Sequence, residues 1–417
     1  MKKTKIALIS DLHVGVTARG LDLCPFPVSE DKKVGRASDF LSRFEAWASE
    51  HASKPLDKVD YLCITGDISN TGHSEEFALA DTAIKRIREA LSLPEERLFY
   101  VPGNHDVHWP VMKLEPSHFW LKHRYAPLLQ ETLGFKRRMR SAEFGRFDDT
   151  PFAVVWRHGD LVVLGVNTSA YDGPQVEPHH GLIKQETIDQ LDAFLKTLAL
   201  PPECLRVCLL HHHLDQYSER LPDVADHSIA VNAENLVRML SSHRVDIVLH
   251  GHKHYPRLGA RQPDNQHPFV MLCAGSFSAV LDPIWHEGTP NLFHVVNING
   301  RDAKTGRIFG QVDTWSYQAH KWQAGNGVAG LYANESFGSG STPSEVKEQI
   351  RESLQNRLKD SSACEWSKIV LDNPTLRHIR TDVAYECFTE VAEAMGFEVV
   401  GDRNTPSKKW VAFRRTE

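Results

Sequence analysis

The sequence lacks any long hydrophobic run. No stretch of about 18 consecutive apolar residues occurs, which is roughly the length that a helix needs to cross a bilayer, so we expect no membrane-spanning helix. The start, MKKTKIALISDLH, places lysines before an apolar run, as a secretory signal does. That run already ends at Ser10 and Asp11 and is shorter than a signal core of about 7 residues. The segment therefore predicts a first buried strand.

Cysteine is sparse and odd in number. The seven cysteines are scattered, mostly inside apolar runs, where a thiol serves as a small core residue. This usage is typical of a reducing compartment, so we expect a cytoplasmic protein. Cys204 and Cys208 form a CxxxC pair, but nothing beside them completes a zinc knuckle. We therefore expect both thiols in the core.

A surplus of basic residues is missing as well. The formal net charge is −6, which gives no general electrostatic footprint for nucleic acid, so nucleic acid is not the favoured partner. One basic cluster, residues 136–140, lies in a long predicted insertion over residues 107–150. That insertion is either a lid over a substrate or an amphipathic flap packed on the body.

Short apolar, β-branched runs, each ended by glycine or polar residues, are what the sequence has instead. Their continuous hydrophobicity predicts strands buried on both faces. They are residues 5–10, 59–65, 97–101, 161–167, 206–210, 245–249, 269–274 and 293–298. Apolar residues at helical spacing predict helices between them, over residues 40–47, 77–91 and 188–198. Strands that alternate with helices predict a layered α/β fold to about residue 300.

The composition changes after Gly300. Residues 306–317 predict an added strand, and residues 325–341 are rich in glycine and serine, as connections are. Thr342 and Pro343 predict the start of a helix, with Glu345 as an imperfect capping partner. We therefore predict three parts: a main domain over 1–300, a strand and connection over 301–341, and a small α+β module over 342–417.

Metal-competent side chains follow five of the predicted strands. In α/β sheets, ligands gather at the carboxyl ends of strands, so we expect these side chains at one site. They are Asp11 and His13; Asp67; Asn104, His105 and Asp106; the triplet His211, His212 and His213; and His250, His252 and His254.

Their spacing predicts which of them face a common centre. In extended backbone, residues i and i+2 point to the same side, so Asp11 and His13 are expected to face one centre, as are the outer residues of 252–254. Asn104 and His105 are adjacent and are expected to point apart. One of the two can bind a metal while the other faces whatever approaches it.

The charge of this set predicts the kind of site. Seven side chains are too many for one tetrahedral ion and suit two metals if one carboxylate bridges them. A set rich in imidazole and poor in carboxylate favours manganese, iron or zinc over calcium or magnesium. Two divalent ions, two carboxylates and one hydroxide sum to about +1, which attracts an anion such as a phosphate ester. The seven are Asp11, His13, Asp67, Asn104, His211, His252 and His254.

Taken together, the motifs resemble the calcineurin-like metallophosphoesterase superfamily. They stand in the family order over residues 11–254: Asp11-x-His13, Gly66-Asp67, Gly103-Asn104-His105-Asp106, a strand-end histidine, and Gly251-His252-x-His254. The segments GDISNTGHSEEF (66–77) and VPGNHDV (101–107) resemble its cyclic-nucleotide phosphodiesterase-like branch. The resemblance implies a four-layer α/β/β/α sandwich as the catalytic domain, with the C-terminal module appended.

The resemblance also implies a role for each residue. One metal takes Asp11, His13 and His254, the other takes Asn104, His211 and His252, and Asp67 bridges both. A metal-bridging hydroxide attacks phosphorus in line. His105 is left to protonate the leaving oxygen or to stabilise transition-state charge, with Asp106 orienting it.

The histidine triplet leaves one alternative open. In the resembling branch the strand ends in His-His-Pro and the first histidine reaches the metal, which implies His211. His213 stands at the proline position and shares a face with His211 if the backbone stays extended, so it is the alternative ligand. His212 is expected to point elsewhere, and His250 is expected to be a buried supporting residue.

The leading functional hypothesis is a metal-dependent phosphodiesterase that acts on a nucleotide or another small diester. The first alternative is a DNA nuclease similar to the Mre11/SbcD branch, although that branch carries an aspartate near the position of Ser69 or Asn70. The second is a metallophosphoesterase fold that serves as a binding scaffold. The sequence leaves homo-oligomerisation open.

Overall fold

The computed structural model describes residues 1–52, 58–107, 144–146, 150–171, 180–216, 228–263, 266–282, 286, 288–325, 327, 331–403 and 408–414. They form two compact units. Unit 1 comprises Met1, Lys5–Val295 and Trp315–Gln323, and unit 2 comprises Lys2–Thr4, Val296–Thr314 and Ala324–Glu417. Most of the predicted insertion over 107–150, with its basic cluster and its suggested lid, lies outside the described residues.

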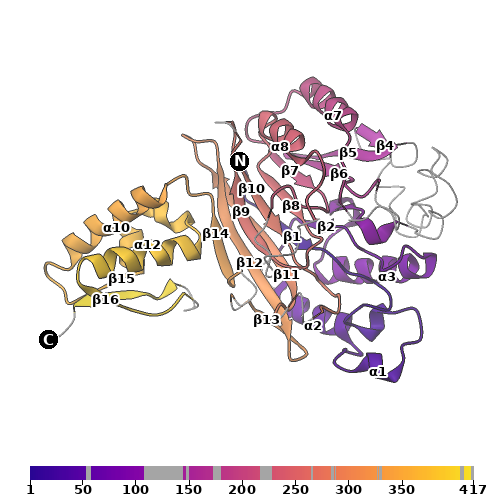
Figure 1. Cartoon of the computed structure of the whole chain (residues 1–417), viewed down its shortest axis with the longest axis horizontal. Helices are drawn as coiled ribbons and strands as arrows, with labels where there is room; N and C mark the ends of the chain where they lie inside the picture. Colours follow the sequence, from indigo (N-terminus) through magenta and orange to yellow (C-terminus); the bar gives the residue numbers. More distant parts are fainter. Residues whose placement is uncertain are drawn as a thin grey trace. The chain divides into compact units, whose positions relative to one another are not determined.

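Two large sheets run through the described residues (Figure 1). The first has the strand order β13-β12-β11-β1-β2-β3 and the second β4-β5-β6-β7-β8-β10-β9. The strands of the first are β1 (Thr4–Ile9), β2 (Tyr61–Thr65), β3 (Leu98–Val101), β11 (Asn291–Arg301), β12 (Ile308–Gln318) and β13 (Lys321–Ala324). Those of the second are β4 (Phe144–Arg146), β5 (Thr150–His158), β6 (Leu161–Val166), β7 (Leu205–Leu209), β8 (Ile247–His250), β9 (Arg257–Arg261) and β10 (Phe269–Cys273).

The strands that precede the predicted site residues run parallel within each sheet. β1 pairs with β2 and β2 with β3 in the first sheet, while β6, β7, β8 and β10 pair in that order in the second. The strands are almost wholly buried, as their continuous hydrophobicity predicted. The loops that follow these strands therefore leave each sheet from one edge.

Helices cover the outer face of each sheet. α2 (Phe40–Ala52) contacts α3 (Ser74–Ala90) and packs on the first sheet, where the Phe44 ring lies 5.2 Å from that of Phe293. α7 (Gln185–Thr197) and α8 (Ala233–Ser242) place Leu191 and Leu236 in the core of the second sheet. The two sheets meet through the contacts of β2 with β7 and of β3 with β6. Unit 1 thus has the predicted α/β/β/α layers.

Short helices complete unit 1. They are η1 (Leu21–Leu23), α1 (Glu30–Lys33), η2 (Glu95–Arg97) and η3 (Asn104–Asp106).

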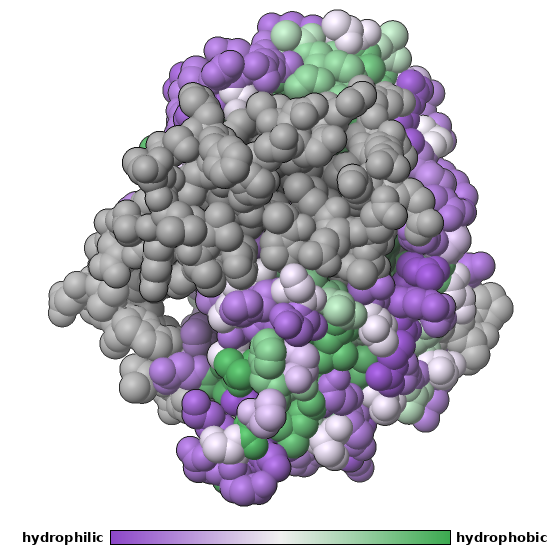
Figure 2. Space-filling model, turned by 90° about the vertical axis from the view of Figure 1, so that its right-hand side faces the viewer, coloured by the Kyte–Doolittle hydropathy of each residue, from purple (hydrophilic) through white to green (hydrophobic). Residues whose placement is uncertain are grey.

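Among the described residues, no helix has the length and apolar character that a bilayer crossing requires. On the face shown in Figure 2, the described side chains are largely hydrophilic, with hydrophobic ones in small groups between them. All seven cysteines are free, and all but Cys24 are buried.

The C-terminal part of unit 2 has a core of its own, formed around Trp410, Phe388 and Ile350. Its elements are α10 (Pro343–Arg357), β15 (Ala363–Glu365), α11 (Trp366–Asp372), η5 (Pro374–His378), α12 (Thr381–Ala394), β16 (Phe397–Val400) and β17 (Val411–Arg414). The sheet order is β15-β17-β16, with both pairings antiparallel. Elsewhere in unit 2, β14 (Asn334–Phe337) pairs with β12.

One feature of this module differs from the prediction. Glu345 was expected to be an imperfect capping partner, but Thr342 and Glu345 form a full reciprocal capping box at the start of α10. The charged residues along α12 are all acidic: Asp382, Glu386, Glu390 and Glu393.

Candidate metal centre

The structure brings all seven predicted ligand residues together at the carboxyl ends of the strands. Asp11, Asp67, His211 and His252 each stand two residues beyond the end of a strand, namely β1, β2, β7 and β8. Asn104 follows β3 at the start of η3. Since β1 to β3 belong to the first sheet and β7 and β8 to the second, both sheets contribute to one site.

One group of ligand atoms comes from Asp11, His13, Asp67 and His254, which all lie within 4.8 Å of one another. His13 Nε2 is 3.0 Å from His254 Nε2 and 3.5 Å from Asp67 Oδ2. His254 Nε2 is also 3.2 Å from Asp11 Oδ1. Asp11 and Asp67 are fully buried or nearly so. This group is a candidate metal-ligand cluster.

A second group shares Asp67 with the first. His211 Nε2 lies 3.3 Å from Asp67 Oδ2 and 3.0 Å from Asn104 Oδ1. His252 Nδ1 lies 3.1 Å from Asn104 Oδ1 and 3.2 Å from His211 Nε2. The Oδ2 atom of Asp67 is therefore within 3.5 Å of a nitrogen in each group. Asp67 is placed to touch two ions at once.

The distances between the facing nitrogen atoms are those expected for ligands of a shared metal ion. Neighbouring ligand nitrogens around an ion with metal–nitrogen bonds of about 2.0–2.1 Å lie roughly 3–3.4 Å apart, and the facing nitrogens here are 3.0 and 3.2 Å apart. His211 donates its Nδ1 hydrogen to the Thr65 carbonyl at 2.8 Å. That bond leaves Nε2, which faces Asp67 and Asn104, as the nitrogen that can bind a metal ion once it has lost its proton, as in metal sites with an ordered outer shell.

Burial and neighbouring charges set the protonation of the site. Burial lowers the pKa of His13 to about 3 and holds the pKa of His252 well below its ordinary value. For His211, burial opposes protonation, but Asp67 outweighs it and raises the pKa to about 9. Burial likewise opposes ionisation of Asp67, yet His211 and His105 keep its pKa well below the usual range. A cation beside Asp67 would displace the proton of His211.

The backbone of the site residues is not extended. Asp11, His13, Asp67, His252 and His254 all have positive φ, between 48° and 82°. The assumption of extended backbone is therefore wrong. Asp11 and His13 nevertheless lie in one group, as predicted, whereas His252 and His254 reach different groups. Left-handed backbone at a non-glycine residue costs about 1–3 kcal/mol, so tight packing on all sides must hold these residues in place.

The motif glycines are required by close approach to these residues. A Cβ at Gly103 would overlap Asp67, and one at Gly66 would come within 2.5 Å of His211 Nδ1. A Cβ at Gly251 would overlap Ser10 Oγ and Asp11 Oδ2. The glycines in the three motifs therefore let the loops from different strands close on one another.

Replacing Gly251 by alanine is expected to weaken metal binding by about 10–100-fold without changing any ligand, which is the usual effect of disturbing a ligand's support. The added methyl group would push Asp11 from its position. Gly259→Ala on β9 is the matched control, because a Cβ there meets no atom within 4 Å. Metal affinity, measured by titration of metal-free protein, checks the prediction, and equal affinity in the two variants would contradict it.

His105 and Asp106 have different supports from those expected. Asp106 accepts hydrogen bonds from the backbone nitrogens of Ser69 and Gly103, both at 2.8 Å. The expectation that Asp106 orients the His105 ring is thus wrong: it joins the loops after β2 and β3. Burial, with the charge of Asp67, raises the Asp106 pKa to about 6. The His105 ring is instead held by a 2.7 Å bond between Nδ1 and the Asn70 carbonyl.

The three histidines of the triplet point to three different places. His211 faces Asn104 and Asp67, as described above. His212 Nδ1 lies 2.8 Å from Thr168 Oγ1, and its ring centroid is 4.3 Å from that of His252, so it supports a site residue. His213 turns away to the Gly251 carbonyl, 3.0 Å from its Nε2. His213 is therefore not placed as the alternative to His211.

Ser276 and Ser278 were missed in the sequence. Their hydroxyls donate to the carbonyls of Asp11 and Leu12, at 2.8 and 2.6 Å, and so fix the first motif. They follow the end of β10, which is parallel to β8. The signal was present, because polar residues after a predicted strand marked the other five motifs as well.

A family model described as calcineurin-like phosphoesterase matches residues 4–256 of the chain. The match covers every residue of the two groups. A comparison with curated proteins finds no match.

Solved structures similar to this chain include a purple acid phosphatase from yellow lupin (Lupinus luteus) seeds, with 14% identity and a TM-score of 0.44 over 76% of this chain and 54% of that one. GAP50, the anchor in the inner membrane complex of Plasmodium, is 10% identical, with a TM-score of 0.37 over 77% of this chain and 87% of that one. Vps29 of Entamoeba histolytica is 12% identical, with a TM-score of 0.29 over 77% and 96%.

Proposed function

The chain belongs to the calcineurin-like phosphoesterase family, and from this membership we propose that it is a dinuclear-metal phosphodiesterase acting on a nucleotide or another small diester. The observation that carries the proposal is the position of Asp67, whose Oδ2 lies within 3.5 Å of a histidine nitrogen in each ligand group. A single shared carboxylate between two groups is what a two-metal site requires.

The ligand assignment follows the two groups. Asp11, His13 and His254 would hold one ion, Asn104, His211 and His252 the other, and Asp67 both. When bound, the ions supply Lewis-acid catalysis and lower the pKa of water. The mixture of imidazole, carboxylate and amide ligands favours manganese, iron or zinc.

The charge of the site supports a diester over a monoester. Two carboxylates leave two divalent ions incompletely neutralised, with a surplus of about +1 once an attacking hydroxide is counted. A diester carries one negative charge, whereas a monoester carries about −1.5 to −2 at pH 7. The single negative charge of the diester matches the surplus.

His105 is suited to act on the leaving group. Its backbone nitrogen donates to Asp67 Oδ1 at 2.9 Å, which fixes the residue beside the shared carboxylate. Its ring lies edge-on to that of His13, with centroids 4.6 Å apart, and its Nδ1 is engaged by Asn70. We assign the ring the task of protonating the leaving oxygen or stabilising charge on it.

The test compares two chromogenic substrates. Manganese-loaded protein is expected to hydrolyse bis-p-nitrophenyl phosphate with a kcat/KM about tenfold or more above that for p-nitrophenyl phosphate, a factor equal to about 1.4 kcal/mol. Chelation should abolish both activities, and added metal should restore them. A higher kcat/KM for the monoester would contradict the preference for diesters.

The same assay separates the alternatives. Degradation of single-stranded DNA that exceeds turnover of small diesters would favour a nuclease, and metal binding without turnover would favour a scaffold. At the position where the nuclease branch carries aspartate, Ser69 bonds Asp106 and the Gly72 nitrogen instead. We also propose that the chain belongs to the cyclic-nucleotide phosphodiesterase-like branch, on the basis of its sequence motifs. A cytoplasmic location is proposed from the free thiols.

A further inference from the structure

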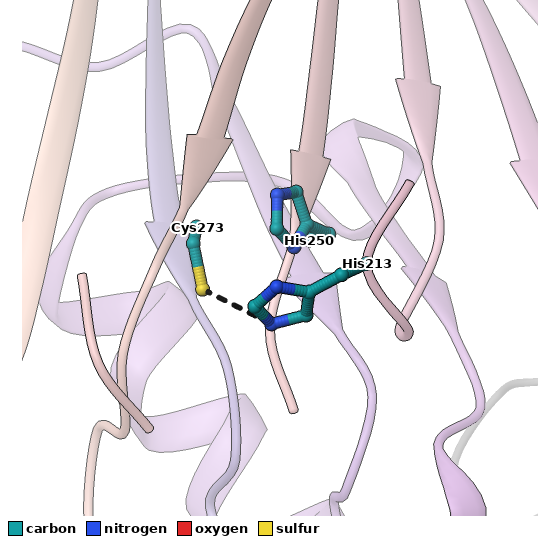
Figure 3. Close-up of side chains that lie close together, drawn as sticks. All are labelled: His213, His250 and Cys273. Carbon is teal, nitrogen blue, oxygen red and sulfur yellow. Dashed lines mark hydrogen bonds between the residues drawn. The ribbon is translucent and has the colours of Figure 1, made fainter. Parts of the chain in front are cut away.

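Unit 1 contains a second cluster of metal-ligating side chains that the proposed catalysis does not use. His213, His250 and Cys273 converge at the ends of β7, β8 and β10 (Figure 3), and each offers a ligand atom within 4.8 Å of the others. All three side chains are completely buried. His250 and Cys273 are the last residues of the neighbouring strands β8 and β10, whereas His213 lies four residues after the end of β7.

The distances are close to those around a tetrahedral ion. Cys273 Sγ lies 3.9 Å from His213 Nε2, and the rings of His213 and His250 are 4.7 Å apart between centroids at 68°. A tetrahedral zinc ion with a sulfur bond of about 2.3 Å and nitrogen bonds of about 2.0–2.1 Å separates sulfur from nitrogen by roughly 3.6 Å. For this pair, a shift of a few tenths of an ångström would therefore suffice.

We propose that His213, His250 and Cys273 form a separate structural site for a thiophilic transition-metal ion of the zinc class. Two imidazoles and a thiolate are softer ligands than the carboxylates and amide of the candidate metal centre, so this site selects zinc-like ions. The Gly251 carbonyl, 3.0 Å from His213 Nε2 and 3.5 Å from Cys273 Sγ, lies beside the position of the ion.

Binding of a metal ion would change the protonation of Cys273 and His213. The Cys273 thiol releases its proton to solvent, because the thiolate is the metal ligand. His213 Nε2 now donates to the Gly251 carbonyl, so binding through that atom moves the ring proton to Nδ1. No oxidant or other reactant is needed.

The bound ion would brace the candidate metal centre. His213 stands two residues after His211, and His250 stands two residues before His252. An ion held by both would tie together the two loops of the second sheet that carry ligands of the other centre. This role goes beyond the proposed function, because these three side chains are completely buried and the proposed hydrolysis does not use them.

Cobalt substitution tests the proposal directly. The seven residues of the candidate metal centre include no cysteine, so a near-ultraviolet thiolate-to-cobalt charge-transfer band in Co²⁺-loaded protein must come from another site. We expect this band in the wild-type chain, together with a third equivalent of bound metal by elemental analysis. We expect Cys273→Ala to lose the band and one equivalent. Cys208→Ala, which removes a buried thiol from β7, is the matched control and should keep both.

Two further measurements keep the result unambiguous. Cys273→Ser retains a hydroxyl for the Gly251 carbonyl and guards against a folding defect, and it should also lose the band. Asp67→Asn should retain the band, so the two sites can fail independently. A wild-type chain without the band, or a band that survives in Cys273→Ala, would overturn the proposal and leave the cluster as packed, hydrogen-bonded side chains.

Discussion

Replacing Asp67 by asparagine is expected to remove at least one of the two metal ions and to lower kcat/KM by about 10³-fold or more. The Oδ2 atom of Asp67 lies against a histidine ring nitrogen in each ligand group, at 3.3 and 3.5 Å. An amide brings no charge to hold two cations. The loss of several kcal/mol of charge stabilisation corresponds to this factor, since each 1.4 kcal/mol is tenfold in rate.

The asparagine variant should still fold, because its amide oxygen can accept the His105 backbone hydrogen bond that Asp67 Oδ1 accepts at 2.9 Å. Asp246→Asn is the matched control. That carboxylate is also completely buried, but it accepts from the Arg206 backbone, away from the site. Metal per chain and turnover of bis-p-nitrophenyl phosphate are measured for both. Asp67→Asn protein with two ions and unchanged turnover would refute the bridging role.

The second large effect is expected for His105→Ala, which should keep both metal ions and slow turnover by about 10²–10⁴-fold, the usual contribution of general acid–base catalysis. The metals should remain because the anchoring bond to Asp67 comes from the backbone nitrogen of residue 105 and not from its ring. The ring itself contacts His13 only edge-on.

Comparing diesters with different leaving groups distinguishes the two roles proposed for His105. If the ring donates a proton to the leaving oxygen, the variant should lose more activity on a diphenyl ester than on the bis-p-nitrophenyl ester, whose leaving group needs no proton. Equal losses on both would indicate charge stabilisation instead. His51→Ala on α2 serves as the control for removing a histidine elsewhere. Loss of metal from the His105 variant would contradict the assignment.

The layered fold could be predicted because its signals are local. Continuous apolar runs such as those of β6 and β8 are typical of strands buried between layers, and the helical stripes of α2, α3 and α7 mark their faces toward a sheet. The strand predicted over residues 306–317 is present as β12, but the next strand, β13, was not predicted. The capping box of Thr342 and Glu345 is also more complete than the sequence indicated.

The supporting contacts of the site could not be predicted. Asp106 is next to His105 in sequence, yet it bonds the loop after β2, because the two loops come together only when β2 and β3 pair. His213 follows His211 at the spacing that extended backbone would place on one face, but the chain turns and directs it to Cys273 and Gly251. Such choices depend on neighbours that are more than thirty residues away.

The sequence by itself determined the layers, the strands and the set of metal-competent residues, because hydrophobic period and residue chemistry act locally along the chain. Only the tertiary structure decided which of these residues lie together and which contacts hold each of them. The pairing of parallel strands sets the separation between loops, and close packing holds Asp11, His13, Asp67, His252 and His254 in left-handed backbone that no isolated segment would prefer. That packing places Asp67 between two groups and brings His213, His250 and Cys273 close together.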